Sequence, residues 1–227
     1  NTWTEVGLQI PDGELHWMVR SEIPSGVGLK SSSAVAAAAV LALADATSTE
    51  LEIAQVVEVA VRAQFTAGCT VTGSVDDTWA ALTLGWKVVN PSVPVAEGVA
   101  LEGIWPNPED WAVFIIERGD RTAEIDPQAF GMAQANFQKA LMAIQQGALD
   151  NAITENGRGV ATATRDTAGR KICNDLLVWG ARCASISGSG PSIAFLIPTV
   201  NEAAIDRILE TLEQRGLTVF ETAIRTE

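Results

Sequence analysis

The 227-residue sequence is poor in the residue types on which several common chemistries depend. It has no tyrosine and a single histidine, His16, which argues against a histidine-based triad or a multi-histidine metal site. Its three cysteines are an odd number and show no CxxC spacing; they are Cys69, Cys173 and Cys183. This usage predicts reduced thiols in a cytosol, because a disulfide framework or a zinc site needs paired or closely spaced cysteines.

Basic residues are also scarce, with 15 Lys and Arg against 28 Asp and Glu, for a net charge of −13. Such a surface repels polyanions, so we expect neither nucleic acid nor an anionic membrane as a partner. An anionic small molecule would need cations gathered locally. The alanine-rich run 34–44 is far shorter than the ~20 residues that a membrane crossing requires, and no signal peptide is visible although the chain begins at Asn1. A cytoplasmic location is expected.

The composition is that of a globular protein, with 47% hydrophobic and 19% charged residues. The length fits one large domain or two small ones. Pro106-Asn107-Pro108 is the best candidate boundary, because paired prolines interrupt regular structure. We therefore expect domains at 1–108 and 109–227.

Hydrophobic periodicity and turn residues predict the elements of both halves. In the first half we expect strands at 2–10 and 14–20, a helix at 34–44 buried on nearly every face, a second helix starting near Thr49 and stopping near Gly68, helix or strand at 78–84, and a strand at 86–90. In the second half we expect strands at 111–117, 192–197 and 217–224, and helices at 127–147, 149–165 (broken by Gly157 and Gly159), 175–180 and 202–214.

The most informative stretch runs from Ile23 to Leu43 and reads IPSGVGLKSSSAVAAAAVLAL. Its turn-forming start and apolar continuation predict a glycine-rich loop that leads into a helix. Glycines allow close backbone approach to a ligand, and free N–H groups at a helix start favour an anion. Lys30 adds a positive charge, and the serines of 31–33 can cap the helix or offer hydroxyls to a phosphate or its Mg2+. A phosphate site is the favoured interpretation; an ordinary capped helix is the alternative.

Two further segments could contribute chemistry. Asp76 and Asp77 are adjacent, and side chains of adjacent residues usually point in different directions, so one carboxylate is expected to cap a helix while the other faces a cavity. Capping or solvent exposure of both is equally compatible with these residues. The segment 187–191 reads SGSGP, a turn that could approach a ligand closely, although a plain tight turn explains it as well.

Taken in order, the three segments PSGVGLKSSSA, TVTGSVDDTWAALTLG and SISGSGPSIAFL resemble the motifs of the GHMP small-molecule kinases over nearly the whole chain. The forms GLKSSSA and TVTG followed by DD are similar to those of the archaeal-type shikimate kinases. The resemblance implies a two-domain α+β fold, with an N-terminal half like ribosomal S5 domain 2 and a ferredoxin-like C-terminal half. The family's first motif has no counterpart here, so we expect the chain to lack the extreme N-terminal strands of the family.

The resemblance also implies roles for individual residues. The ATP phosphates would be wrapped by Pro24, Ser25, Gly26, Val27, Gly28, Leu29, Lys30, Ser31, Ser32 and Ser33, and lined by Gly188, Ser189 and Gly190. Ser32 would coordinate Mg2+. Asp77 matches the catalytic aspartate, with Asp76 as the fallback, and Lys30 would help to neutralise the transferred phosphoryl group. The Mg2+-holding carboxylate of some relatives has no clean match; Gln64 lies nearest its place, and Glu58 two turns earlier.

The function implied is ATP-dependent phosphorylation of a hydroxyl on a small carboxylic acid, with shikimate as the first choice. Four arginines are candidates for binding the acceptor carboxylate: Arg118, Arg121, Arg165 and Arg170. Three alternatives stay open: a sibling kinase acting on homoserine or mevalonate, a nucleotide-binding paralogue without catalysis, and a purely structural domain. A homodimer is possible.

Overall fold

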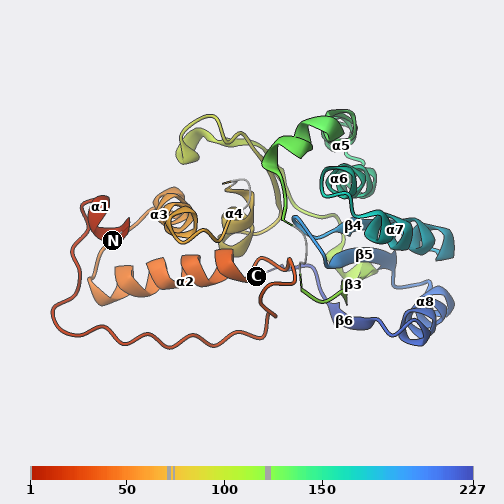
Figure 1. Cartoon of the computed structure of the whole chain (residues 1–227), viewed down its shortest axis with the longest axis horizontal. Helices are drawn as coiled ribbons and strands as arrows, with labels where there is room; N and C mark the ends of the chain where they lie inside the picture. The colour runs from red at the N-terminus through yellow and green to blue at the C-terminus, as the bar shows by residue number, and fades with distance from the viewer. Residues whose placement is uncertain (1, 71–72, 74, 121–123, 227) are drawn as a thin grey trace. The chain divides into compact units, whose positions relative to one another are not determined.

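The computed structural model describes residues 2–70, 73, 75–120 and 124–226 (Figure 1). These residues form two compact units. The first comprises residues up to Ser25 together with Lys30–Ile104, and the second comprises Gly26–Leu29 together with Trp105–Thr226. The four residues Gly26–Leu29 therefore belong to the second unit, although the chain on either side of them belongs to the first. The domain limits 1–108 and 109–227 stay a prediction.

The first unit is mainly helical. Its elements are α1 (Thr2–Glu5), α2 (Ser31–Ala46), α3 (Ile53–Thr66), α4 (Asp76–Leu82), β1 (Trp86–Val89), the 3₁₀ helix η1 (Val95–Glu97) and β2 (Val99–Gly103). Helix α2 packs against both α3 and α4, and β1 pairs with β2 in an antiparallel hairpin. Strand β2 was not foreseen in the sequence. Helix α3 begins after a capping box in which Glu52, and not Thr49, is the N-cap.

Helix α2 buries one stripe and not its whole surface. The buried residues recur at helical spacing and are Ser33, Ala37, Val40 and Ala44. Leu41, on another face, is 44% exposed. The expectation of burial on nearly every face is therefore wrong, because small alanine side chains can face solvent at little cost and do not by themselves indicate burial.

The strands expected at 2–10 and 14–20 are not found. Residues Thr2–Glu5 form α1, where Trp3 is buried and its indole N–H donates to the carbonyl of Gln9 at 2.7 Å. Residues 14–20 have no regular structure and are exposed. An alternating pattern produces a strand only when a neighbouring strand accepts its hydrogen bonds, and 14–20 pairs with no strand in the part of the chain that the structure describes.

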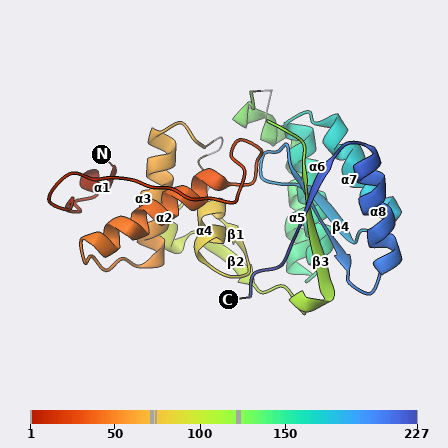
Figure 2. The ribbon, with the colours of Figure 1, turned by 90° about the horizontal axis from the view of Figure 1, so that it is seen from below.

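The second unit is built on a four-stranded antiparallel sheet with the order β4-β5-β3-β6 (Figure 1). Figure 2 shows β3 and β4 of this sheet beside the helices of the same unit. Its elements are η2 (Pro108–Asp110), β3 (Trp111–Glu117), η3 (Pro127–Ala133), α5 (Gln134–Gln145), α6 (Leu149–Ala163), α7 (Thr167–Trp179), β4 (Cys183–Ile186), β5 (Ile193–Pro198), α8 (Glu202–Gln214) and β6 (Thr218–Thr222). The expected strand at 111–117 and helix at 202–214 are confirmed.

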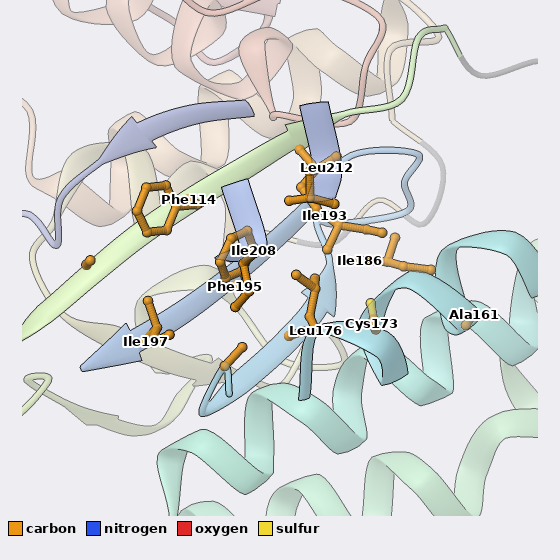
Figure 3. Close-up of a cluster of buried hydrophobic side chains, with 14 of the residues drawn as sticks. Phe114, Ala161, Cys173, Leu176, Ile186, Ile193, Phe195, Ile197, Ile208 and Leu212 are labelled. Atoms are coloured by element: carbon orange, nitrogen blue, oxygen red, sulfur yellow. The ribbon is translucent and has the colours of Figure 1, made fainter. Parts of the chain in front are cut away.

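The core of the second unit lies where one face of this sheet meets helices α6, α7 and α8 (Figure 3). Alternate residues of the central strands point into it, as the period-two geometry of a strand requires. Phe114 and Phe195 stack with ring centroids 5.1 Å apart, and Leu176, Ile208 and Leu212 from the helices are fully buried.

Helix α6 runs unbroken through the glycines that were expected to interrupt it. A Cβ on Gly157 would lie 2.6 Å from Ser185, and one on Gly159 would lie 2.6 Å from the Phe137 ring. These glycines are thus required by close packing, which the sequence alone could not distinguish from a helix break. No helix in the described parts of either unit is long and apolar enough to cross a membrane.

Candidate active site

The segment Gly26–Leu29 lies on the turn that joins β4 to β5. The Ser187 hydroxyl donates to the carbonyl of Gly28 at 3.0 Å, and the backbone N–H of Ser192 donates to the carbonyl of Val27 at 3.1 Å. Val27 itself is buried, with 3% of its surface exposed. Two of the three segments picked out in the sequence are therefore in direct contact within the second unit.

Gly28 is the point of closest approach between the two segments. Its φ is +84°, in the left-handed region, and a Cβ built there would lie 2.3 Å from the carbonyl oxygen of Gly190. Gly190 also has a positive φ, of +80°. Because the obstructing atom belongs to the backbone, no side-chain movement could make room for a larger residue. Glycine at position 28 therefore permits this close contact.

A half-buried ion pair supports the same turn. Arg118, just after β3, binds both carboxylate oxygens of Asp166, at 2.5 and 2.9 Å, and donates to the carbonyl of Pro191 at 3.0 Å. Asp166 also accepts from the N–H of Gly169 at 2.7 Å and so caps α7. Burial alone would raise the pKa of Asp166, but the hydrogen bonds from Arg118 and Gly169 and the charge of Arg118 together lower it below 3.8.

Lys30 stands at the N-cap of α2, with a φ of +64°. Its carbonyl accepts from the N–H groups of Ser33 and Ala34, at 3.1 and 3.2 Å. Its ammonium group makes an ion pair with the carboxylate of Asp77 in the first turn of α4. Two residues predicted to serve catalysis are thus in contact within the first unit, although 47 positions separate them in the sequence.

Asp77 is the more enclosed of the two adjacent aspartates, since its side chain is 24% exposed whereas Asp76 is an exposed residue. The pKa of Asp77 is raised from 3.8, first because burial disfavours the carboxylate and second because Asp76 is negative, while Lys30 acts in the opposite direction. An aspartate with a raised pKa is a better proton acceptor than an ordinary surface carboxylate. Both aspartates lie inside α4, whose N-cap is Val75.

A buried amide joins the helices that carry these residues. Gln64 of α3 is 6% exposed. It accepts a hydrogen bond from the Ser33 hydroxyl at 2.8 Å and donates to the Thr78 hydroxyl at 3.1 Å. The sequence had indicated Gln64 only because it lies nearest the position of the Mg2+-holding carboxylate of some relatives. It had not indicated Thr78. The available signal was a glutamine within an otherwise apolar helical face. Glu58, by contrast, pairs with Arg62 on the exposed side of α3.

The other predicted loop residues are less enclosed. Ser25 and Gly26 are exposed, and Pro24, Leu29, Ser31 and Ser32 are half-buried. Of the candidate acceptor-binding arginines, Arg165 and Arg170 are exposed, and Arg118 is held by Asp166. Arg121 and the positions 71, 72 and 74 of the second motif lie outside the described residues.

The oxygen donors of the described residues bear on how Mg2+ could bind. The described residues contain no group of three or more His, Cys, Asp or Glu side chains able to hold a metal by themselves. They do place the hydroxyl of Ser32 and the carboxylates of Asp76 and Asp77 at the starts of two helices that pack together. This oxygen donor set fits Mg2+ that arrives with a phosphate group, since Mg2+ commonly uses one or two protein oxygens beside phosphates and waters.

Residues 3–85 match the model of the GHMP kinases N terminal domain. The chain is 32% identical to the shikimate kinase of Methanothrix thermoacetophila, over 90% of this chain and 68% of that protein. The chain therefore belongs to the GHMP kinases. Within that family it is similar to proteins named shikimate kinase, since that of Methanothermobacter thermautotrophicus is also matched, at 28% identity over 89% of this chain and 70% of that protein.

Solved structures agree on the fold. The homoserine kinase of Cytophaga hutchinsonii superimposes with a TM-score of 0.62 at 21% identity, covering 91% of this chain and 68% of that chain. At this identity the match bears on the fold alone. The two-part α+β fold of the GHMP kinases, predicted from the three motifs, is confirmed.

Proposed function

We propose that the protein is a shikimate kinase, which transfers the terminal phosphoryl group of ATP to a hydroxyl of shikimate and forms shikimate 3-phosphate and ADP. This reaction belongs to aromatic amino acid biosynthesis. The observation that carries the proposal is the ion pair of Lys30 with Asp77, which joins the end of the glycine-rich loop to the predicted catalytic aspartate. The similarity to proteins named shikimate kinase supports the choice of acceptor.

The proposed nucleotide site is the stretch Pro24–Ser33. Its N–H groups and the start of α2 would bind the phosphates, because a helix N-terminus favours anions. Gly188, Ser189 and Gly190 would contribute through the turn on which Val27 and Gly28 rest. The backbone contact at Gly28 keeps this part of the loop in one conformation, so little ordering would be needed when ATP binds.

Mg2+ would be held by the hydroxyl of Ser32 and by ATP, and it would neutralise charge on the phosphates. Lys30 would interact with the transferred phosphoryl group as well as with Asp77. Phosphoryl transfer depends on positioning and charge neutralisation more than on covalent chemistry by the protein. The residues of this chain supply both requirements from one short segment.

Asp77 would accept the proton of the attacking hydroxyl. In the transfer, the acceptor oxygen forms a bond to the terminal phosphorus, the bond from that phosphorus to the bridging oxygen breaks, and the proton moves to the Asp77 carboxylate. The raised pKa of Asp77 suits this role, since its main cause, burial, makes the carboxylate a stronger base than an ordinary aspartate. Asp76 stays the fallback.

The acceptor carboxylate requires a cation. Arg165 and Arg170 are the exposed candidates, whereas Arg118 is engaged by Asp166 and Pro191. Phosphorylation of homoserine or mevalonate is the alternative function, and the comparison of acceptors in the assay below decides between them. Cys173 and Cys183 are unsuited to nucleophilic catalysis, because burial raises the pKa of each thiol to about 12.

We further propose that the enzyme acts in the cytoplasm. The three cysteines are free in the structure, which suits a reducing compartment.

The test is a coupled assay of ADP formation by the purified chain with ATP and Mg2+, comparing shikimate, homoserine and mevalonate as acceptors. We expect ADP formation to depend on shikimate and to be lost in Asp77→Asn. ATP binding measured by calorimetry completes the design. Binding of ATP without acceptor-dependent ADP would identify a nucleotide-binding paralogue, and no binding at all would point to a structural domain.

A further inference from the structure

Gln64 is a buried polar side chain near the proposed site, with 6% of its surface exposed. It is the third residue from the end of α3, and its side-chain amide uses both of its ends. The carbonyl oxygen Oε1 accepts from Ser33 Oγ at 2.8 Å; the nitrogen Nε2 donates to Thr78 Oγ1 at 3.1 Å and to the Ala60 carbonyl at 3.3 Å. Ser33 and Thr78 are themselves 3% and 0% exposed. Water cannot easily replace these bonds.

The two hydroxyls that Gln64 joins stand at equivalent places in two helices. Ser33 is the third residue of α2 and follows Ser32, whereas Thr78 is the third residue of α4 and follows Asp77. One side chain from α3 therefore ties together the helix starts that carry the proposed Mg2+ hydroxyl and the proposed catalytic carboxylate.

The ion pair of Lys30 with Asp77 is a second link between the same helix starts, but it differs in kind. Its side chains are 34% and 24% exposed, so solvent and a bound phosphate can both compete for Lys30. The Gln64 link is neutral and enclosed, and it does not depend on charges that change during the reaction. It can hold the helix starts in register while Lys30 exchanges partners.

The chemistry of this position calls for an amide. The contacts require an acceptor toward Ser33 and a donor toward Thr78 and the Ala60 carbonyl, and glutamine supplies both in one rigid group. A methionine of similar length would leave the buried hydroxyls of Ser33 and Thr78 without their hydrogen bonds to residue 64. A carboxylate would face the Ala60 carbonyl with no proton to donate.

We propose that Gln64 is a positioning residue that sets the relative placement of Ser32 and Asp77 through the hydroxyls of Ser33 and Thr78. The inference rests on the proposed kinase function, and it adds a residue that acts through others without touching the substrates. It predicts that the two hydrogen bonds of Gln64 affect different kinetic constants. The bond to Ser33 would position the nucleotide site, and the bond to Thr78 would position the proposed base, Asp77.

Three substitutions test this division in steady-state kinetics: Ser33→Ala, Thr78→Val and Gln64→Met. We expect Ser33→Ala to raise the KM for ATP with a smaller change in kcat, and Thr78→Val to lower kcat with a smaller change in KM. Gln64→Met should do both, by up to about 100-fold in kcat/KM, the scale of an ångström misplacement. The double variant Ser33→Ala with Gln64→Met should be no worse than Gln64→Met alone, since both remove the same bond.

The matched control is Val56→Ala, which lies on the same helix, is 0% exposed and packs in an apolar cluster. It should lower Tm while leaving kcat and KM near wild type, when all variants are assayed well below their Tm. Kinetic constants of Gln64→Met that match those of Val56→Ala would overturn the inference. Should Gln64→Met fail to fold, Ser33→Ala and Thr78→Val still decide it, and equal effects on kcat and KM from both would refute the division.

Failure of the inference can be told from failure of the proposed function. A wild-type chain that forms no ADP with any acceptor contradicts the kinase proposal. The Gln64 inference is then judged by calorimetric ATP affinity, which Gln64→Met and Ser33→Ala should weaken and Val56→Ala should not. Unchanged ATP affinity in both polar variants would overturn it independently of catalysis.

Discussion

Two neighbouring segments of the same loop are held in different ways. Gly26–Leu29 is fixed in the second unit by main-chain contacts to the 187–192 turn, with Gly28 against the backbone of Gly190. Lys30, the next residue, is held in the first unit by its side chain, through an ion pair with Asp77. Main-chain contacts provide a fixed shape, whereas a half-exposed ion pair can exchange partners. The loop therefore combines a segment of fixed shape, the proposed rigid cradle Gly26–Leu29, with an exchangeable ion pair, the proposed reactive pair of Lys30 and Asp77.

The two units also differ in their cores. The second unit buries one large cluster against a four-stranded sheet (Figure 3). The first unit has smaller clusters around Trp3 and Trp79, a two-stranded hairpin, and exposed apolar side chains at Trp17, Met18 and Val19. The stability of each variant in the first unit should therefore be measured before a change in its kinetic constants is assigned to catalysis.

The largest effect is expected from the reactive pair. Asp77→Asn removes the proposed proton acceptor while keeping its size, so kcat should fall by about 10²–10⁴-fold, the usual contribution of general base catalysis. ATP affinity measured by calorimetry should stay near wild type. Asp45→Asn, at an exposed position on α2, is the control and should be unaffected. Turnover that survives in Asp77→Asn would remove this residue from the mechanism.

The next effect tests the rigid cradle. Gly28→Ala places a Cβ 2.3 Å from the Gly190 carbonyl at a φ of +84°. A non-glycine residue in such a conformation costs about 1–3 kcal/mol before the clash is counted, so the KM for ATP should rise about tenfold or more. Gly131→Ala is the control, because nothing lies within 4 Å of its Cβ. If Gly28→Ala binds ATP normally, the loop is not a preformed cradle.

How far the sequence foretold this arrangement depended on the kind of signal. Strand β3 and helix α8 were predicted because their periodicity is local. The strand expected at 14–20 failed, since a strand requires a hydrogen-bonding partner that the pattern cannot reveal. Gly157 was read as a helix break because its contact with Ser185 comes from elsewhere in the chain. The Gln64 network was invisible for the same reason, as its partners lie 31 and 14 positions away.

A smaller effect is expected at the ion pair that supports the 187–191 turn. Asp166→Asn leaves Arg118 without its counter-charge and should lower the free energy of unfolding of the second unit by about 2 kcal/mol at pH 7. Asp175→Asn is the control: its pair with Arg215 is more exposed, with side chains 43% and 27% exposed, and such pairs contribute less than about 1 kcal/mol. Equal losses from both variants would contradict a special role for Asp166.

The same pair predicts a pH dependence. The pKa of Asp166 is lower in the folded chain than its ordinary value, so its carboxylate stabilises the fold fully above the unfolded pKa of about 3.9. This contribution is lost as the pH falls below that value. Denaturant unfolding should therefore show a difference between wild type and Asp166→Asn that is largest at pH 7 and shrinks below about pH 4. A difference that is constant with pH would exclude the ion pair as its source.

The smallest effect is expected from Asp76→Asn, a substitution that distinguishes the roles of the two adjacent carboxylates. Asp76 is exposed and raises the pKa of Asp77 by charge repulsion. In Asp76→Asn this repulsion is gone, so Asp77 should lose its proton at lower pH and the acid limb of the kcat profile should move to lower pH. At neutral pH the rate should change by no more than a few-fold, as expected for a screened interaction. A collapse of kcat comparable to that of Asp77→Asn would instead assign the proton transfer to Asp76, and the enclosed position of Asp77 would then serve only to hold Lys30.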